Sequence, residues 1–583
     1  MLSHRPSSWS RLVAWCHVLP VLAGFAFLGC QKEAPKPVIS TPPKPAWTTL
    51  FSFHSAGGTQ VLADTNAASL RRVLELPETA VLRSNLTMKL VSAVTTVFST
   101  QLDTSAYAPL LTPLLDDLMT RETWLALRSR AGDPEPVWNG AVLLDGAKLA
   151  LWQTNLSSVL GMSSNTVRVV TAGGVQAQEF RLGTKGFRFA SVGNWLLWTA
   201  GAGEETGLGE WADAVTKSGR PCPVATDYWM KVDADFEALK VAPPLLWPTP
   251  ISHGTLTVVG HKGRLTTSAH ITFKEDPGLR IEPWTIPTNA VHDPLVSFTA
   301  GQGLDLWAST WQSPTNVAVP KFASQYYIWA RSDVAFMTLF ATPMPDATNV
   351  LRSVSPDLAS FVNKEMDGKG AGGLMWSSNR TELSWRGLPA MIPYVQAFTD
   401  PSGEFLHGGF FPVSKAFTNP APAELLGQVA GRTNLVYYDW EITEERLAHW
   451  SQMFQFLSLV SMKPKFDPTS AAQAWLKAVA PVLGNVITEV TRESAREFKM
   501  VRRSESGFTG IELNFLAQWF EETNFPFASL RMPFEPVGFA LPPPRPSRGT
   551  NRVRAATPPS PGGPVSTPSA LPAVPVPVPP AAK

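Results

Sequence analysis

Cysteine is scarce in this chain of 583 residues, which contains only Cys16, Cys30 and Cys222. So few cysteines exclude a disulfide framework and a zinc site built from cysteine pairs. Cys16 lies in an apolar N-terminal stretch, and Cys222 stands between Pro221 and Pro223. A lone cysteine in such surroundings is more often a small buried apolar side chain than a reactive thiol. The sequence therefore favours a structural role for Cys222, with a reactive thiol as the alternative.

Charged residues are also few, at 16% of the chain, whereas hydrophobic residues make up 44%. The formal net charge of +2 arises at the two ends of the chain. The first 30 residues and those after Leu541 contribute seven basic residues and no acidic ones, so the body between them carries about −5. A slightly acidic body lacks the positive surface that nucleic acid requires. We therefore expect no nucleic-acid partner.

Motifs of several enzyme classes are absent as well. The chain has no H-E-x-x-H, no P-loop and no G-x-S-x-G nucleophile elbow. Gly201–Gly207 imitates a dinucleotide loop only loosely, because two glutamates would face the pyrophosphate. If Val259 pairs with Arg264, His253 lies opposite His270 in a hairpin, but a zinc site there lacks a third ligand. The sequence thus predicts no metal and no cofactor, and it favours a non-enzymatic protein.

An apolar segment, Leu12–Cys30, follows Arg5 and Arg11 near the N-terminus. A positive region followed by an apolar one is typical of an export signal. The segment is interrupted by His17 and Pro20 and barely reaches the roughly 20 residues of a membrane-spanning helix. We therefore expect the protein to be exported.

Residues 27–30, with the sequence FLGC, resemble the lipobox of bacterial lipoproteins. The resemblance implies that Cys30 is acylated and becomes the mature N-terminus, which would anchor the protein in a membrane. Gln31 after the cysteine is compatible with sorting to the outer membrane. Cleavage near Gly24 and Ala26 without lipid is one alternative, and an uncleaved anchor is another.

The length of the chain exceeds what one hydrophobic core usually serves, and two proline-rich stretches mark its ends. The last 43 residues contain 14 prolines and cannot bury enough apolar surface to fold. A further proline-rich run at 242–250 suggests a domain boundary. The predicted segments are a signal peptide at 1–30, a tether at 31–46, a first domain at 47–245, a second domain at 246–540 and a disordered cationic tail at 541–583.

Hydrophobic periodicity predicts an α+β fold class, with two domains of mainly antiparallel sheet packed against helices. Apolar residues recur at every fourth position from Leu82 to Phe98, and further helices are expected at 443–460 and 471–482. Segments of strand character flank turns, and Trp195–Thr199 is apolar on both faces of its pleat, which predicts cover on both sides. The predicted hairpins pair TWLALRS with VWNGAVLLD, TVRVV with VQAQEFRL, FRFASV with WLLWTA, GTLTVV with RLTTSAHITF, GLMWSS with ELSWRG, and FKMVRR with FTGIELNF.

Aromatic strand ends followed by acidic residues recur along the chain and supply the candidate binding residues. They suggest a duplicated strand–cap–helix unit. Mixed aromatic and acidic groups also occur in glycan sites, where rings stack on sugars. The candidates of this kind are Tyr228, Trp229, Tyr437, Tyr438, Asp439 and Trp440.

Carboxylate pairs offer a hydrolytic alternative, because glycosidases use two carboxyl groups across a cleft. Asp116 with Asp117, Asp233 with Asp235, and Asp439 with Glu441 are the available pairs. Helix capping is the simpler interpretation for Asp233, Asp235 and Asp439, since each precedes a predicted helix.

The order of elements from Asp64–Leu74 through AVLLDGAKLALW and GFRFASVGNWLLW to YWMKVDADFEAL resembles large bacterial envelope proteins that carry a domain of unknown function. This resemblance implies no activity. We expect an envelope lipoprotein, exported and sorted to the outer membrane, that acts as a non-enzymatic binding or structural component. Its partners would be the membrane, through the lipid, and an envelope polymer or glycan. The alternatives are a secreted carbohydrate-active hydrolase and a lipid or amphiphile carrier with an apolar cavity.

Overall fold

The computed structural model describes residues 46–527, and the described part belongs to one compact unit. The expectations for the signal peptide, for Cys30, for the tether up to residue 45 and for the tail lie outside the described residues. Within the range, the residues not described are 99–103, 134, 164–166, 183–184, 203–206, 224–227, 241–248, 310–320, 334–336, 368–371, 378–380, 389–390, 412–418, 461–466 and 468.

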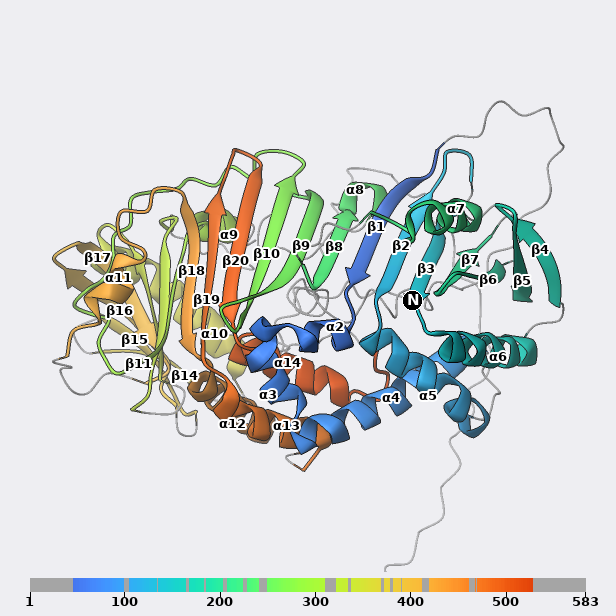
Figure 1. Cartoon of the computed structure of the whole chain (residues 1–583). Coiled ribbons are helices and arrows are strands. Elements are labelled where there is room, and N and C mark those ends of the chain that lie inside the picture. The colour runs from blue at the N-terminus through green and yellow to red at the C-terminus, as the bar shows by residue number, and fades with distance from the viewer. Residues whose placement is uncertain are drawn as a thin grey trace, which may run out of the picture. The chain divides into compact units, whose positions relative to one another are not determined.

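Twenty strands of the described chain form one sheet in which all neighbours are antiparallel, which confirms the α+β class (Figure 1). The first ten are β1 Thr48–Ser55, β2 Thr123–Ser129, β3 Val137–Leu143, β4 Val167–Ala172, β5 Val175–Leu182, β6 Lys185–Val192, β7 Trp195–Gly201, β8 Met230–Asp235, β9 Ile251–His261 and β10 Arg264–Phe273. The second ten are β11 Leu295–Gly301, β12 Tyr326–Arg331, β13 Thr338–Pro343, β14 Gly373–Trp376, β15 Glu382–Arg386, β16 Tyr394–Asp400, β17 Gly403–Gly409, β18 Leu435–Ile442, β19 Asn485–Arg492 and β20 Glu497–Ser504.

The strand order is the same in the two sets of ten. From one edge inward the first set runs β4–β5–β6–β7–β3–β2–β1–β8–β9–β10. From the other edge the second set runs β14–β15–β16–β17–β13–β12–β11–β18–β19–β20. The sets meet where β10 pairs with β20, with Leu265 opposite Ser504. We call them the first and second halves. The division into two domains at residue 245 stays a prediction, although the sheet continues from β8 to β9 across that point.

Thirteen α-helices of the described chain accompany the sheet, and several occupy equivalent places in the two halves. They are α2 Gly58–Ala63, α3 Ala68–Leu74, α4 Pro77–Phe98, α5 Thr104–Thr120, α6 Gly146–Ser163, α7 Leu208–Ser218, α8 Phe236–Leu239, α9 Leu304–Ser309, α10 Ala347–Met366, α11 Ala423–Gly427, α12 Thr443–Val460, α13 Ala471–Val479 and α14 Gly510–Glu521. Helices α2 and α9 follow the first strand of each half, α6 and α10 the third, and α7 and α11 the seventh. A glycine with positive φ, Gly57 or Gly303, immediately precedes α2 or α9.

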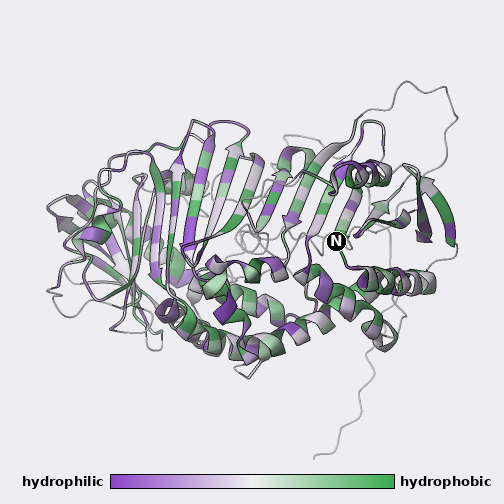
Figure 2. Ribbon diagram, in the orientation of Figure 1, coloured by the Kyte–Doolittle hydropathy of each residue, from purple (hydrophilic) through white to green (hydrophobic). Residues whose placement is uncertain are grey.

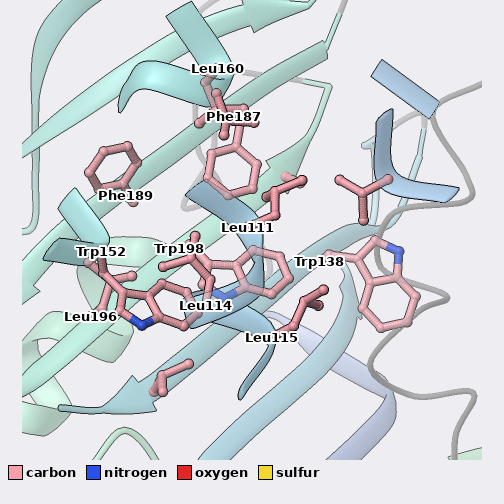
Figure 3. Packing of buried hydrophobic residues seen from close by; sticks show 14 of the residues in the cluster. Leu111, Leu114, Leu115, Trp138, Trp152, Leu160, Phe187, Phe189, Leu196 and Trp198 are labelled. Atoms are coloured by element: carbon pink, nitrogen blue, oxygen red, sulfur yellow. The ribbon is translucent and has the colours of Figure 1, made fainter. Parts of the chain in front are cut away.

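Helices cover both faces of the sheet in the first half. Leu196 and Trp198 of β7 pack with residues of α5 and α6, including Leu111 and Trp152 (Figure 3). The alternate residues of the same strand, Trp195 and Leu197, pack against α7 on the other face. The predicted two-sided cover of this strand is therefore confirmed. Burying each of these large side chains stabilises the fold by about 1.5–3 kcal/mol.

Helices from the two halves join beneath the central strands. Val73 of α3 and Leu82 of α4 pack with Leu447 of α12, Leu476 of α13 and Leu513 of α14. Three predicted helices are confirmed: the one whose apolar stripe begins at Leu82, and those at 443–460 and 471–482. The last of them, α13, ends three residues earlier than expected. Above the helices, apolar and polar residues alternate along the central strands (Figure 2).

Five of the six predicted hairpins form, and one is wrong. FKMVRR lies in β20, but most of FTGIELNF lies in the first half of helix α14 rather than in a strand. Thr509 caps this helix: its side chain accepts from the backbone N–H of Glu512, while the Glu512 side chain accepts from that of Thr509. This capping box fixes the N-terminus of the helix.

The register of the β9–β10 hairpin also differs from the expected one. A two-residue turn of Lys262 and Gly263, both with positive φ, joins the strands, which suits a tight hairpin. His253 therefore lies opposite Thr272, and His270 lies opposite Thr255. The considered His253–His270 pair does not form.

Candidate ligand pocket beside helix α7

A pocket of about 540 Å³ lies in the first half, between helix α7 and strands β1, β2 and β8. The residues around Cys222, which follow α7, close one side. Its wall combines aromatic rings with charged and polar groups. The lining residues are Thr49, Ser52, His54, Trp124, Leu125, Ala126, Arg128, Glu210, Trp211, Ala214, Pro221, Cys222, Pro223, Tyr228, Lys231 and Asp233.

Small side chains on the floor explain why the pocket is open. The pairings of β1 with β2 and of β11 with β12 place His54 opposite Trp124 and Ala300 opposite Tyr327. Counting from these pairs, Ser52 takes the place of Phe298, and Ala126 takes the place of Trp329. Phe298 and Trp329 are completely buried in the second half. Smaller residues at both positions leave space in the first half that aromatic rings fill in the second.

A buried hydrogen-bonded group forms the inner wall. His54 lies 3.1 Å through its Nε2 from Oε1 of Glu122, and the indole N–H of Trp124 is 3.4 Å from the same oxygen. The rings of His54 and Trp124 are 3.9 Å apart, and Tyr228 meets His54 edge-on at 5.5 Å. His54 is 3% exposed, and its Nδ1 has no hydrogen-bond partner in the described part of the chain. A polar atom buried without a partner costs free energy, so it marks a place where a ligand gains by binding.

The pKa of Glu122 is lowered even though the residue is buried. Burial by itself raises that pKa, but the hydrogen bond from His54 and the positive charge of Arg220, 3.7 Å away, outweigh it. Glu122 is therefore an ionised acceptor at neutral pH.

Arg128 supplies the second incompletely bonded group of the pocket. Its Nη2 donates to Glu210 of α7 at 2.7 Å, and its guanidinium lies 5.5 Å from the ring of Trp47. Its other terminal nitrogen, Nη1, is buried and has no hydrogen-bond partner among the described residues. Nη1 lies beside Gly207 and the side-chain amide of Asn139, which do not line the pocket, so the bond to Glu210 is the contact by which Arg128 shapes this wall.

Burial raises the pKa of Cys222 to about 11, and the nearby charge of Arg128 offsets only part of this effect. The thiol is therefore neutral at physiological pH. A neutral thiol is a poor nucleophile, so it serves in this wall as a small polarisable surface.

The predicted binding residues do not come together in one site. Tyr228 lines the pocket, whereas the indole N–H of its neighbour Trp229 donates to Asp64 at 2.9 Å. Tyr438 and Trp440 of β18 pack into the apolar core of the second half. Four strands separate β8 from β18.

Asp439 and Glu441 belong to a different environment, because they alternate with Tyr438 and Trp440 along β18. The Thr299 hydroxyl donates to Asp439 at 2.6 Å, and the backbone N–H of Gly510 donates to Glu441 at 2.7 Å. Burial raises the pKa of both carboxyls, that of Glu441 to about 7. Tyr437 lies near them, and burial together with the charge of Asp439 raises its pKa. The pair is joined to the framework of the fold rather than to the pocket.

Capping explains only one of the three acids for which it was expected. The side chain of Asp235 accepts from the backbone N–H of Ala238 and caps α8. Asp233 instead accepts from Thr255 at 2.9 Å and lies 3.1 Å from Nε2 of His253. Asp439 caps no helix and bonds Thr299. The capping interpretation is therefore wrong for Asp233 and Asp439.

His54, Glu122 and Arg128 were not recognised from the sequence. His54 lies on β1, Arg128 lies on β2, and Glu122 immediately precedes β2. No local sequence motif therefore joins the three residues. One signal was present: Trp124 and Arg128 are an even number of residues apart, which places both on the same face of a strand.

The described residues contain no cluster of three or more acidic, histidine or cysteine side chains that could hold a metal ion. No helix in the described part of the chain combines the length and apolar character that a membrane span requires. Comparison with protein-family models, curated proteins and solved structures finds no match to this chain.

Proposed function

We propose that the protein is an exported, membrane-anchored binding component of a cell envelope, and that the α7 pocket holds its ligand. The observation that carries the proposal is the buried Nδ1 of His54, which has no hydrogen-bond partner in the described part of the chain and belongs to a side chain that lines an open pocket together with Arg128 and Tyr228. Ligand sites commonly combine a largely apolar wall with a few polar groups of this kind.

Binding fits the pocket better than the hydrolytic alternative does. Glu122 is already engaged by His54 and Trp124, and Glu210 is engaged by Arg128. A glycosidase needs one protonated and one free carboxyl group on either side of the substrate. The carrier alternative needs an apolar cavity, whereas this wall contains Arg128, Lys231 and Asp233.

Anchoring at the envelope rests on Cys30 and is tested with the full chain expressed with its own N-terminal segment. We expect the wild-type protein to sediment with membranes and to show the added mass of acyl chains, since several chains give a durable anchor. The Cys30→Ala variant should remain in the soluble fraction. If the two proteins distribute equally between the membrane and soluble fractions, the lipid anchor is excluded. The mass of the N-terminal fragment would then show where the signal segment is cleaved without lipid.

Binding is tested by filling the pocket from α7. Ala214 lines the pocket, and the Ala214→Trp variant places an indole in it. We expect native mass spectrometry of the wild-type protein, purified from membranes, to detect a bound species that the variant lacks. The Lys217→Trp variant, on the exposed last turn of the same helix, is the control and should keep the species. A wild-type protein without any bound species would contradict the proposed function.

A further inference from the structure

Strand β4 forms one outer edge of the sheet (Figure 1). It pairs with β5, and no other strand of the described chain pairs with it. A two-residue turn of Gly173 and Gly174, both with positive φ, joins the two strands, so the residues on either side of it form a hydrogen-bonded pair. Such pairs alternate along an antiparallel ladder. The backbone N–H and C=O groups of Val167, Val169 and Thr171 therefore point away from β5.

The side chains of these three residues are exposed. Val167 is 58% exposed and Val169 is 66% exposed, and Thr171 is exposed as well. They lie on the face of the sheet that α6 covers, because Val169 is opposite Gln178, which accepts from Ser157 of α6 at 2.8 Å. The cover by α6 thus reaches β5 but leaves the outward residues of β4 open.

The sequence of β4 contains none of the devices that usually keep an edge strand from pairing. Natural edge strands often carry proline, outward lysines or a bulge. The β4 sequence VRVVTA has no proline and no lysine, and its ladder with β5 has no bulge. Its one charged residue, Arg168, donates to the buried carboxylate of Glu179. The charge of Arg168 is therefore compensated within the chain.

The edge strand at the other end of the sheet, β14, is protected by a helix. The side-chain amide of Asn363 in α10 donates to the carbonyl of Leu374 at 3.0 Å and accepts from its N–H at 2.7 Å. This amide takes the place of a neighbouring strand. Gly373 makes room for it, because a Cβ there would lie 2.5 Å from Oδ1 of Asn363. The described residues of α6, which holds the equivalent place in the first half, make no such bond to β4.

We propose that β4 pairs with β4 of a second copy of this chain, antiparallel and about a two-fold axis at Val169. With Val169 opposite its own copy, Val167 lies opposite Thr171, so the outward donors of each strand meet the outward acceptors of the other. The β-branched side chains then meet across the two strands, a pairing that stabilises antiparallel sheets. Pairing of β4 with β14 would instead require Asn363 to leave its place. The two edges therefore favour a closed dimer over a filament.

The charges and the helices are compatible with this pairing. Arg168 lies opposite Val170 of the second copy, so the two arginines do not oppose each other, and each keeps Glu179. The two-fold axis runs perpendicular to the sheet, so α6 of both copies lies on one face and α7 of both copies on the other. The dimer therefore presents both α7 pockets on the same side. The pairing itself does not depend on what the pocket binds.

Sedimentation velocity of the full chain, purified from cells, tests the pairing. The Val169→Pro variant removes one outward N–H and preserves the ladder with β5, because that N–H takes no part in it. We expect the wild type to sediment as a dimer and the variant to raise the dissociation constant of the dimer about tenfold or more, since each copy loses a hydrogen bond. The Val169→Lys variant brings two ammonium groups together and should have the same effect. Thermal unfolding of both variants should match that of the wild type.

The Met375→Lys variant is the matched control, because Met375 is 58% exposed on the protected edge strand β14. It should dimerise with the dissociation constant of the wild type. A wild-type chain that stays monomeric over the whole concentration range would overturn the proposal. A dimer that both Val169 variants leave unchanged would overturn it as well, since another surface would then hold the copies together.

A cysteine at the two-fold axis tests the register. The axis places the two copies of residue 169 opposite each other, at a Cα separation of about 5.5 Å that a disulfide can span. Mild oxidation should therefore link the Val169→Cys chains into a covalent dimer. The Thr171→Cys variant should not be linked beyond the level of the wild type, which measures the contribution of the native cysteines. Linking of Thr171→Cys without linking of Val169→Cys would contradict the two-fold axis at Val169.

Discussion

Replacing Glu179 with glutamine is expected to lower the free energy of unfolding by about 3–5 kcal/mol at pH 7, the usual cost of leaving a buried charge without its partner. Glu179 of β5 is completely buried and lies between arginines of both neighbouring strands. Arg188 donates to it at 2.8 and 3.0 Å, and Arg168 donates to its other oxygen. Arg188 is itself 5% exposed, so the variant would leave a buried guanidinium next to a neutral amide.

The direction of the pKa shift of Glu179 determines how the stabilising effect of its ion pairs changes with pH. Burial by itself raises the pKa of Glu179, but the hydrogen bonds from Arg168 and Arg188 outweigh it and hold the pKa below its usual value of 4.5. The ion pairs therefore stabilise the fold above pH 4.5 and lose this effect as the pH falls through the lowered pKa. Urea denaturation at pH 7 and at pH 4 should show a large difference between wild type and variant that shrinks at the lower pH. Glu135→Gln removes an exposed partner of Lys185 and should change stability by less than about 1 kcal/mol. A variant as stable as the wild type at pH 7 would mean that Glu179 does not neutralise this cluster.

Replacing Glu441 with glutamine should have the opposite effect and stabilise the protein at alkaline pH. Burial raises the pKa of Glu441 to about 7, and repulsion by Asp439 adds to the shift. The folded state therefore keeps a proton that the unfolded state loses above pH 4.5, so wild-type stability falls as the pH rises from 4.5 to 7. The glutamine variant has no charge to bury, and its side-chain oxygen can still accept from Gly510. We expect it to be more stable than the wild type by about 3 kcal/mol at pH 8, at 1.36 kcal/mol per pKa unit.

Thermal unfolding at pH 8 and at pH 4 measures this difference, which should disappear at pH 4. Glu444→Gln is the matched control, because Glu444 is exposed in the first turn of α12. At that position the negative charge of the carboxylate interacts favourably with the helix dipole. Its loss should therefore lower the free energy of unfolding slightly, by about 0.5 kcal/mol. A Glu441→Gln variant that is less stable than the wild type at pH 8 would show that the charged carboxylate is held by Arg446 rather than merely buried.

Local patterns were sufficient to predict many elements of the fold from the sequence. The turn at Gly193 and the strand-like segments on either side of it place β6 and β7 correctly, because a hairpin depends on neighbouring residues alone. The stripe from Leu82 gives α4 for the same reason. Helix α5 does not follow from the sequence pattern, because Pro109 and Pro113 lie inside it and proline usually interrupts a helix. The alternation of Ile511, Leu513 and Phe515 predicts a strand where helix α14 forms, and the capping box at Thr509 is the local signal for the helix.

The candidate site depends on relations that no local pattern contains. Whether Ala126 lines a pocket or is covered depends on the side chain at the facing position of β1 and on the helix above it. Neither follows from the residues around Ala126. Tyr228 was recognised because it is aromatic, but its partner His54 lies on another strand, and only the sheet order brings them within 5.5 Å. The four neighbouring candidates on β18 also fail to form one site, because they alternate between the two faces of the strand. They are Tyr437, Tyr438, Asp439 and Trp440.

The pairing of β10 with β20 has a consequence for how the chain reaches its fold. Strand β10 ends at Phe273, whereas its partner begins at Glu497. During synthesis or export from the N-terminus, the edge of β10 therefore stays without a partner until nearly the whole second half has emerged. Unpaired strand edges are templates for wrong association. The polar residues Arg264, His270 and Thr272 on this strand make such association less favourable. The last hairpin to emerge, β19–β20, is the one that closes the sheet.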